Sequence, residues 1–250
     1  MIDGLAGRLE YDIEYGNATS FYSGAKSKTL PYLSEYYSNL RPDGNSKNYE
    51  WKGILERTNL VITEDSFLDN ANRLFRRVEF EALSESNLFD MVSRFVVYSD
   101  CADAALIAGL HYPHKSSNLY YQFENFGSVE VPVSKTKKLI FKSGQSKVPA
   151  GFKEVFYIRD EAKTERGYRW IVHHRLIVDP KECQLVLRCC NPRLEGALPF
   201  QKMIPNWFKR IFFRIREARY PNFPFMSVGE YILQKHDNAV IETMVEIHGR

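Results

Sequence analysis

Long apolar runs and the short motifs of the large enzyme classes are both missing from this 250-residue sequence. No stretch approaches the roughly 20 apolar residues of a membrane-spanning helix. The N-terminus, MIDGLAGRLEYDIEYGN, carries acidic residues early and has no apolar run, unlike a secretory or transit signal. The patterns GxGxxG, GxxxxGK[ST], GxSxG and HExxH are absent. We therefore expect a cytoplasmic protein with no transmembrane segment, outside the large nucleotide-dependent and serine-hydrolase classes.

Cysteine is scarce and follows no disulfide or zinc spacing. The four residues are Cys101, Cys183, Cys189 and Cys190. Because Cys189 and Cys190 would point to opposite faces of a strand, we expect free buried thiols. His111 and His114 have a spacing that can bind zinc, but Pro113 lies between them and no second ligand pair follows. This favours a loop with two exposed histidines, and we expect neither a cofactor nor a bound metal.

Aromatic side chains are abundant, with 15 Tyr and 17 Phe. They can fill a large core, and they also favour tight packing between molecules. The net charge of +3 is mild, which is more typical of solvation than of nucleic-acid binding. No internal repeat is present. We predict a single domain over 1–250, with a candidate seam at 143–151 between a mixed part (1–145) and a strand-rich part (150–250).

The first half of the chain is predicted to mix strands and helices. Apolar residues alternate with charged ones over 8–15, which indicates a strand, and 55–63 is a second strand candidate. Apolar residues at helical spacing predict helices in several segments. These helices are 31–40, 65–76, a segment from Ser86 to about Val96, and 102–110.

The second half is predicted to be mainly antiparallel. Its strand candidates are 119–123, 138–142, 155–159, 168–178, 183–190, 230–234 and 239–247. The last two would form a hairpin through His236, Asp237 and Asn238, and a helix over 205–219 would interrupt the strands. The fold class we predict is α+β, an antiparallel β-sheet or open barrel in the second half with helices packed on one side.

The segment Gly167–Arg193 is the strongest candidate for a functional site. A turn at Asp179–Glu182 would join strand 168–178 to strand 183–190 in a hairpin. One face would be apolar, and it would hold His174 as a core histidine with satisfied hydrogen bonds. The other face would carry Arg169, Ile171, His173 and Arg175 opposite Gln184, Val186, Arg188 and Cys190. In this register His173 lies directly opposite Arg188.

The polar face of this hairpin suggests an anionic small molecule as ligand. The guanidinium fork of arginine suits phosphate and carboxylate, so we predict that Arg169, Arg175 and Arg188 bind it. His173 is the candidate acid or base, with its pKa lowered by the arginines. Cys190 is a candidate nucleophile, because nearby positive charge favours the thiolate.

Charge pairing is an alternative explanation of the same pattern. Glu10, Asp12 and Glu14 share one face of the first predicted strand and could neutralise the arginines. The same carboxylates could instead hold Mg²⁺ or Mn²⁺ while the arginines hold polyphosphate.

A second candidate site is the basic amphipathic segment 204–223. At helical spacing an apolar arc forms from Ile204, Trp207, Phe208, Ile211, Phe212 and Ile215. The other side would be an interaction surface made of Lys209, Arg210, Phe213 and Arg216. Such a helix can bind an anionic membrane or a nucleic acid. Alternatively, the arc packs on the sheet and the basic side is solvated, in which case Phe213 contacts another copy.

Three interpretations follow for the whole chain. The first is a domain, possibly enzymatic, that binds an anionic ligand at the hairpin. The second is a self-assembling structural protein; in length, aromatic content and lack of catalytic motifs the chain resembles viral matrix proteins of the polyhedrin type, with no specific motif involved. The third is peripheral binding to a membrane or nucleic acid through the basic helix.

Overall fold

The protein is seen here as a computed structural model. It describes residues 8–16, 28–29, 48–55, 60–71, 73–88, 90–107, 109–116, 120–124, 128–179, 182, 185–186, 190–191, 196–197, 203–205, 207–208, 211, 215 and 229–249. Every strand pairing in these residues is antiparallel. All elements of the described part of the chain are therefore strands, and helical conformation is confined to a few single positions between 203 and 215.

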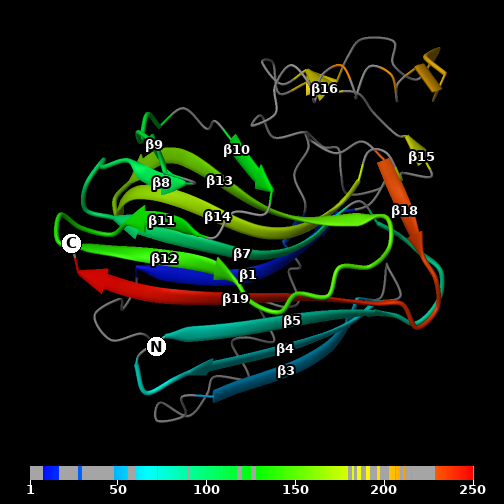
Figure 1. The fold of residues 1–250 in the computed structure, drawn as a ribbon, viewed down its shortest axis with the longest axis horizontal. Helices are drawn as coiled ribbons and strands as arrows, with labels where there is room; N and C mark the ends of the chain where they lie inside the picture. Colours follow the sequence, from blue (N-terminus) through cyan, green and yellow to red (C-terminus); the bar gives the residue numbers. More distant parts are fainter. Residues whose placement is uncertain are drawn as a thin grey trace.

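Two large sheets make up most of the described fold (Figure 1). The six-stranded sheet has the order β10-β13-β14-β7-β1-β2, and the eight-stranded sheet has the order β3-β4-β5-β19-β12-β11-β8-β9. The first contains β1 (Leu9–Gly16), β2 (Lys28–Thr29), β7 (Asp90–Ser99), β10 (Tyr120–Glu124), β13 (Phe152–Thr164) and β14 (Gly167–Val178). The second contains β3 (Asn48–Leu55), β4 (Leu60–Leu68), β5 (Leu74–Ala82), β8 (Ala105–Ile107), β9 (Leu110–Tyr112), β11 (Val129–Pro132), β12 (Lys137–Ser143) and β19 (Asn238–Gly249).

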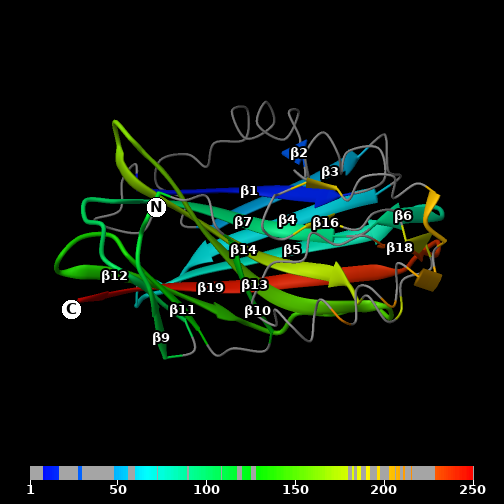
Figure 2. The same ribbon diagram turned by 90° about the horizontal axis from the view of Figure 1, so that it is seen from above.

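Short strands form two further sheets. β18 (Gly229–Leu233) pairs with β15 (Leu185–Val186) and with β6 (Ser86–Leu88). β16 (Cys190–Asn191) pairs with β17 (Gly196–Ala197). The long strands of both large sheets run along the longest axis of the molecule (Figure 2).

The core lies between the two large sheets, because alternate residues of each strand point to opposite faces. Trp170 and Val172 of β14 pack in one buried cluster with Phe141 of β12 and Val245 of β19. Phe95 of β7 belongs to the same cluster, and its ring lies 5.3 Å from that of Phe141. The molecule is thus a β-sandwich in which each sheet contributes one apolar face.

The prediction of an α+β fold is wrong in the described residues. The segment predicted as a helix over 65–76 is the hairpin of β4 and β5, whose turn is held by Asp69. The Asp69 carboxylate accepts hydrogen bonds from the backbone N–H groups of Ala71 and Arg73, each 2.9 Å long. Phe67 and Phe75 then face each other across the strands, with ring centroids 4.9 Å apart. The spacing that looked helical comes from cross-strand neighbours.

Two more predicted helices are strands. Residues 86–96 form β6 and much of β7, which is buried on both faces, and a run of this kind has no period that separates helix from strand. Residues 102–110 contain β8 and the start of β9. The predicted helix 31–40 lies outside the described residues. The first strand and most strands predicted in the second half are confirmed.

The predicted hairpin of strands 168–178 and 183–190 is also wrong. β14 pairs with β13 on one side and with β7 on the other. β13 and β14 are joined by a tight turn before Gly167, whose φ is +118° and whose added Cβ would lie 2.4 Å from the Ser99 carbonyl oxygen. Of the predicted strand 183–190, only Leu185, Val186 and Cys190 are described, and they lie in β15 and β16.

A turn does form at His236 and Asp237, where Asp237 donates a 3.0 Å hydrogen bond to the Gln234 carbonyl. However, the described strands on either side of it do not pair with each other as predicted. β18 pairs with β6 and β15, and β19 pairs with β5 and β12. The turn therefore connects two different sheets.

Candidate functional site

β14 places its two histidines on opposite faces, as the alternation predicts. His174 points into the core between the sheets and is fully buried, which confirms the prediction of a core histidine. His173 points to the opposite face of the six-stranded sheet, away from the core, which we call the outer face. There it lies between Tyr157 of β13 and Arg94 of β7, and its ring stacks on Tyr157 with centroids 5.2 Å apart. Arg188, the predicted neighbour, lies outside the described residues.

Arginines on this outer face are paired with carboxylates. Arg175 pairs with Asp90, and Arg169 pairs with Glu161. Arg94 lies 2.6 Å from Asp12 of β1. Charge pairing therefore does occur on this face, but the partners of Arg169 and Arg175 are Glu161 and Asp90, and Asp12 pairs with an arginine of β7 outside the predicted hairpin. An anion bound by Arg169 and Arg175 has to compete with carboxylates that are already in contact with them, so binding there stays a prediction.

Burial decides the charge state of the groups in the centre of the outer face. The pKa of His173 is lowered well below its usual value, first by burial and then by Arg175, Arg94 and Arg159. Burial raises the pKa of Asp90, while Arg175 acts in the opposite direction. A neutral His173 can lie beside several arginines without charge repulsion. The direction of the His173 shift agrees with the prediction, although two of the three arginines differ from those expected.

The second half of the predicted catalytic pair is not part of this face in the described residues. Cys190 lies in β16, opposite Ala197, and its side chain is outside the described part. The roles of His173, Cys190 and Arg188 stay predictions. Among the other cysteines, Cys101 is buried and free, as expected for an inert thiol. Cys183 and Cys189 lie outside the described residues.

A polar bridge that the sequence did not reveal crosses the interior of the sandwich. The ring of His174 has Nδ1 2.8 Å from the Thr243 hydroxyl of β19 and Nε2 2.6 Å from the Glu154 carboxylate of β13. The Ser143 hydroxyl of β12 donates a 2.6 Å hydrogen bond to the same carboxylate. Burial acts to raise the pKa of Glu154, but the bonds from His174, Ser143 and Ser146 outweigh it and bring the pKa to about 2.

The order carboxylate, imidazole, hydroxyl is also that of a nucleophilic triad. Here the hydroxyl of Thr243 and the ring of His174 are both fully buried, whereas Glu154 is partly exposed. A substrate would meet the carboxylate and not the hydroxyl. We therefore interpret the bridge as a connection that holds the two sheets together.

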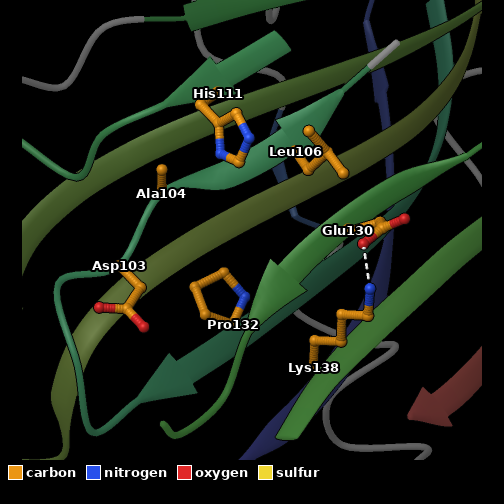
Figure 3. A pocket seen from close by; sticks show the side chains of 7 residues that line it. All are labelled: Asp103, Ala104, Leu106, His111, Glu130, Pro132 and Lys138. Atoms are coloured by element: carbon orange, nitrogen blue, oxygen red, sulfur yellow. Dashed lines mark hydrogen bonds and ion pairs between the residues drawn. The ribbon is translucent and has the colours of Figure 1, made fainter. Parts of the chain in front are cut away.

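A pocket of about 420 Å³ lies at the β8–β9 end of the eight-stranded sheet (Figure 3). Its lining residues are Asp103, Ala104, Leu106, His111, Glu130, Pro132 and Lys138. Lys138 and Glu130 form an ion pair 2.5 Å long. The sequence placed His114 beside His111 in one loop. In the structure His114 has different contacts, and its Nε2 atom lies 3.1 Å from the Arg169 carbonyl oxygen. The two histidines therefore have different surroundings, and His111 alone lines the pocket.

Described residues of the amphipathic segment are strongly exposed. Trp207, Phe208, Ile211 and Ile215 have helical backbone conformation, and all four side chains are exposed. Trp207 is 65% and Ile215 is 63% exposed. These side chains of the apolar arc therefore do not pack on the sheet, unlike in the alternative interpretation. Lys209, Arg210, Phe213 and Arg216 lie outside the described residues.

No group of three or more His, Cys, Asp or Glu side chains in the described ranges is arranged to hold a metal ion. Of the acidic strand residues considered for Mg²⁺, Asp12 is bound to Arg94, and Glu10 accepts a hydrogen bond from the Tyr98 hydroxyl. The side chain of Glu14 is not described. In the described residues there is also no helix long and apolar enough to cross a membrane.

Comparisons with known proteins give no family. No family model matches the sequence, and no curated protein matches it. One matching solved structure is that of a protein from Escherichia coli K12 provisionally assigned as an aldose 1-epimerase. It has a TM-score of 0.45 and 7% sequence identity, over 99% of this chain and 87% of that chain. The similarity is weak, and we draw nothing from it about activity.

Proposed function

We propose that this chain is a peripheral binding protein that attaches to anionic membrane surfaces through residues 203–215, with the β-sandwich as its scaffold. The observation that supports it is a cluster of exposed large apolar side chains in one short segment. These are Met203, Trp207, Phe208, Ile211 and Ile215, with Met203 81% exposed. Elsewhere in the described residues, large apolar side chains such as Leu110 and Phe67 are exposed singly, which is normal for a protein surface.

The charge of the same segment supports an anionic partner. Between positions 201 and 216 the sequence has five cationic residues and no acidic one. They are Lys202, Lys209, Arg210, Arg214 and Arg216. Each cation close to an anionic leaflet contributes about 1 kcal/mol, and a helix with Trp and Ile on one side can bury that side at the boundary between headgroups and acyl chains.

Two other partners fit less well. A second copy docked face to face would bring the same cations together, because a two-fold interface repeats one patch on both subunits. A nucleic acid would use the cations and stack on Trp207 and Phe208, but it offers nothing comparable to the aliphatic side chains of Met203, Ile211 and Ile215. An anionic membrane can interact with the cations, the aromatic rings and the aliphatic side chains of the segment.

Co-sedimentation with vesicles tests the proposal. Wild type should bind vesicles of phosphatidylcholine mixed with phosphatidylserine, bind vesicles of phosphatidylcholine alone at least about tenfold less, and lose affinity as salt is added. The double variant Trp207→Ser/Ile211→Ser should lose binding because it removes the inserted apolar surface. Lys209→Glu/Arg210→Glu should lose it because it reverses the charge.

Leu110→Ser is the matched control, because Leu110 is 54% exposed on β9 and outside the segment. It should bind vesicles like wild type. Trp207→Ser/Ile211→Ser and Leu110→Ser should keep the thermal unfolding midpoint of wild type, since the side chains that they replace are exposed. The proposal is wrong if wild type ignores both vesicle types, if Leu110→Ser loses as much binding as the double variants, or if the segment variants abolish only dimer formation or only a DNA or RNA band shift.

A further inference from the structure

The pocket at the end of the eight-stranded sheet combines an aliphatic floor with a polar rim. Ala104, Leu106 and Pro132 supply the apolar part. Asp103 lies on one side of it and the Glu130–Lys138 pair on the opposite side, with the His111 ring between them along the rim (Figure 3). Its volume of about 420 Å³ lies in the lower part of the range for small-molecule sites, roughly 300–1,000 Å³.

The charge of the lining side chains argues against an anionic ligand. The lining has two carboxylates and one ammonium group, so it carries a formal charge of −1 when His111 is neutral. Lys138, the single cationic side chain among the described residues of the lining, is already paired with Glu130 at 2.5 Å. A phosphate or carboxylate ligand would therefore meet a carboxylate on either side of the pocket and have no cation to itself.

The hydrogen-bonding groups narrow the choice further. A carboxylate offers about four acceptor sites and an ammonium group three donors, so the Glu130–Lys138 pair has bonding capacity beyond its mutual contact. A simple amine would donate hydrogen bonds to a carboxylate but could accept none from the ammonium group of Lys138. An apolar ligand would remove water from the whole rim without replacing its hydrogen bonds. A hydroxyl group donates and accepts at once and so fits both sides.

We propose that this pocket binds a small uncharged polyhydroxylated molecule of the monosaccharide class. The aliphatic floor would contact the C–H face of the ring, and the rim would exchange hydrogen bonds with its hydroxyl groups. Asp103, Glu130 and His111 accept and Lys138 donates. The site is separate from the described residues of the proposed membrane segment, because none of those described within 203–215 lines it. A ligand of this size would bind in such a pocket with a dissociation constant of about a millimolar.

NMR titration of the full chain with glucose, galactose and mannose, one at a time, tests the proposal. At least one sugar should shift the backbone amide signals of residues 103–111 and 130–138 in a saturable way. Asp103→Asn and His111→Ala should each weaken binding about three- to tenfold. Leu106→Trp should abolish sugar binding, because the indole fills the pocket. As a control, Glu165→Gln on the distant exposed turn before β14 should bind the sugar like wild type.

Ethanolammonium and inorganic phosphate are the competing probes. The proposal is overturned if no sugar saturates the signals, if Leu106→Trp binds the sugar as well as wild type, or if ethanolammonium or phosphate binds more tightly than every sugar. A folded Leu106→Trp is recognised by its unchanged amide spectrum away from the pocket. Vesicle binding should be the same in all pocket variants, so failure of this proposal and failure of the membrane proposal are seen in different measurements.

Discussion

The Nε2 atom of His174 lies 2.6 Å from a carboxylate oxygen of Glu154, and this contact runs from the buried ring of His174 to the partly exposed carboxylate. Both residues belong to the six-stranded sheet, and each also contacts the eight-stranded sheet, His174 through Thr243 and Glu154 through Ser143. The sandwich is thus held by a polar bridge as well as by its apolar core. Removal of one member leaves buried polar groups without partners, which is costly in a low-dielectric interior.

The first prediction concerns the acid stability of this bridge. The pKa of Glu154 falls from its ordinary value of 4.5 to about 2. Because the carboxylate is partly exposed, solvent screening reduces the corresponding free energy of unfolding to about 1–2 kcal/mol. Because the folded pKa is the lower one, this contribution is fully present above pH 4.5 and is lost as the pH falls toward 2. Urea unfolding of wild type should show that loss, and Glu154→Gln should flatten it. Equal pH dependence of both proteins would contradict the role of Glu154.

The second prediction concerns the buried ion pair of Arg76 and Glu64. Both side chains are 0% exposed, and Arg76 Nε lies 2.6 Å from Glu64. Arg76→Met leaves a buried carboxylate without its cation, so it should lower the free energy of unfolding by about 3–5 kcal/mol. Arg76→Met/Glu64→Leu removes both charges and should recover most of that loss. A double variant as unstable as the single one in denaturant titrations would show that the two charges are not coupled.

The third prediction concerns the protonation of His173. Burial and the nearby arginines lower its pKa well below 6.5. Its folded state therefore binds fewer protons than its unfolded state, and the stability it contributes is present above pH 6.5 and is lost as the pH falls below it. Its ring signals in an NMR titration should not move between about pH 7.5 and 5.5. His173→Phe, which retains a ring beside Tyr157, should remove this part of the pH dependence. A titration midpoint near 6.5 would contradict it.

The fourth prediction separates charge pairing from anion binding on the outer face. In Asp90→Asn the Arg175 guanidinium loses its carboxylate while it stays buried. We expect a lower thermal unfolding midpoint, by several degrees, that sulfate at constant ionic strength partly restores, because the anion takes the place of the carboxylate. Wild type should gain less from sulfate. Equal or greater stabilisation of wild type would instead support a native anion site at Arg169 and Arg175.

Local alternation was sufficient to predict the strands that have one polar and one apolar face. β1 and β14 were both recognised this way, together with the opposite orientation of His173 and His174. β7 was missed because its residues are buried on both faces, so its sequence has no period of two to detect. The β-branched residues Val92, Val96 and Val97 of this segment were the signal that favoured a strand.

Pairing between distant strands could not be derived from the sequence. β14 lies between β13, its neighbour in the chain, and β7, whose Phe95 pairs with Val172 although the two are 77 positions apart in the sequence. The surroundings of His173 follow from that arrangement, because Arg94 and Tyr157 come from the two flanking strands. The pocket was missed for a similar reason, since it is assembled from β8, β9, β11 and β12 and the segment before β8.

The position of β19 has a consequence for biosynthesis. This strand lies in the middle of the eight-stranded sheet, with β5 on one side and β12 on the other. While the ribosome has yet to release it, β5 and β12 each present an open row of N–H and C=O groups that can pair with other nascent chains. Closure of the sheet therefore has to wait until β19, which is synthesised after both of its neighbours, has left the ribosome, and we expect a chaperone that shields strand edges to raise the yield of soluble protein more than a lower growth temperature does.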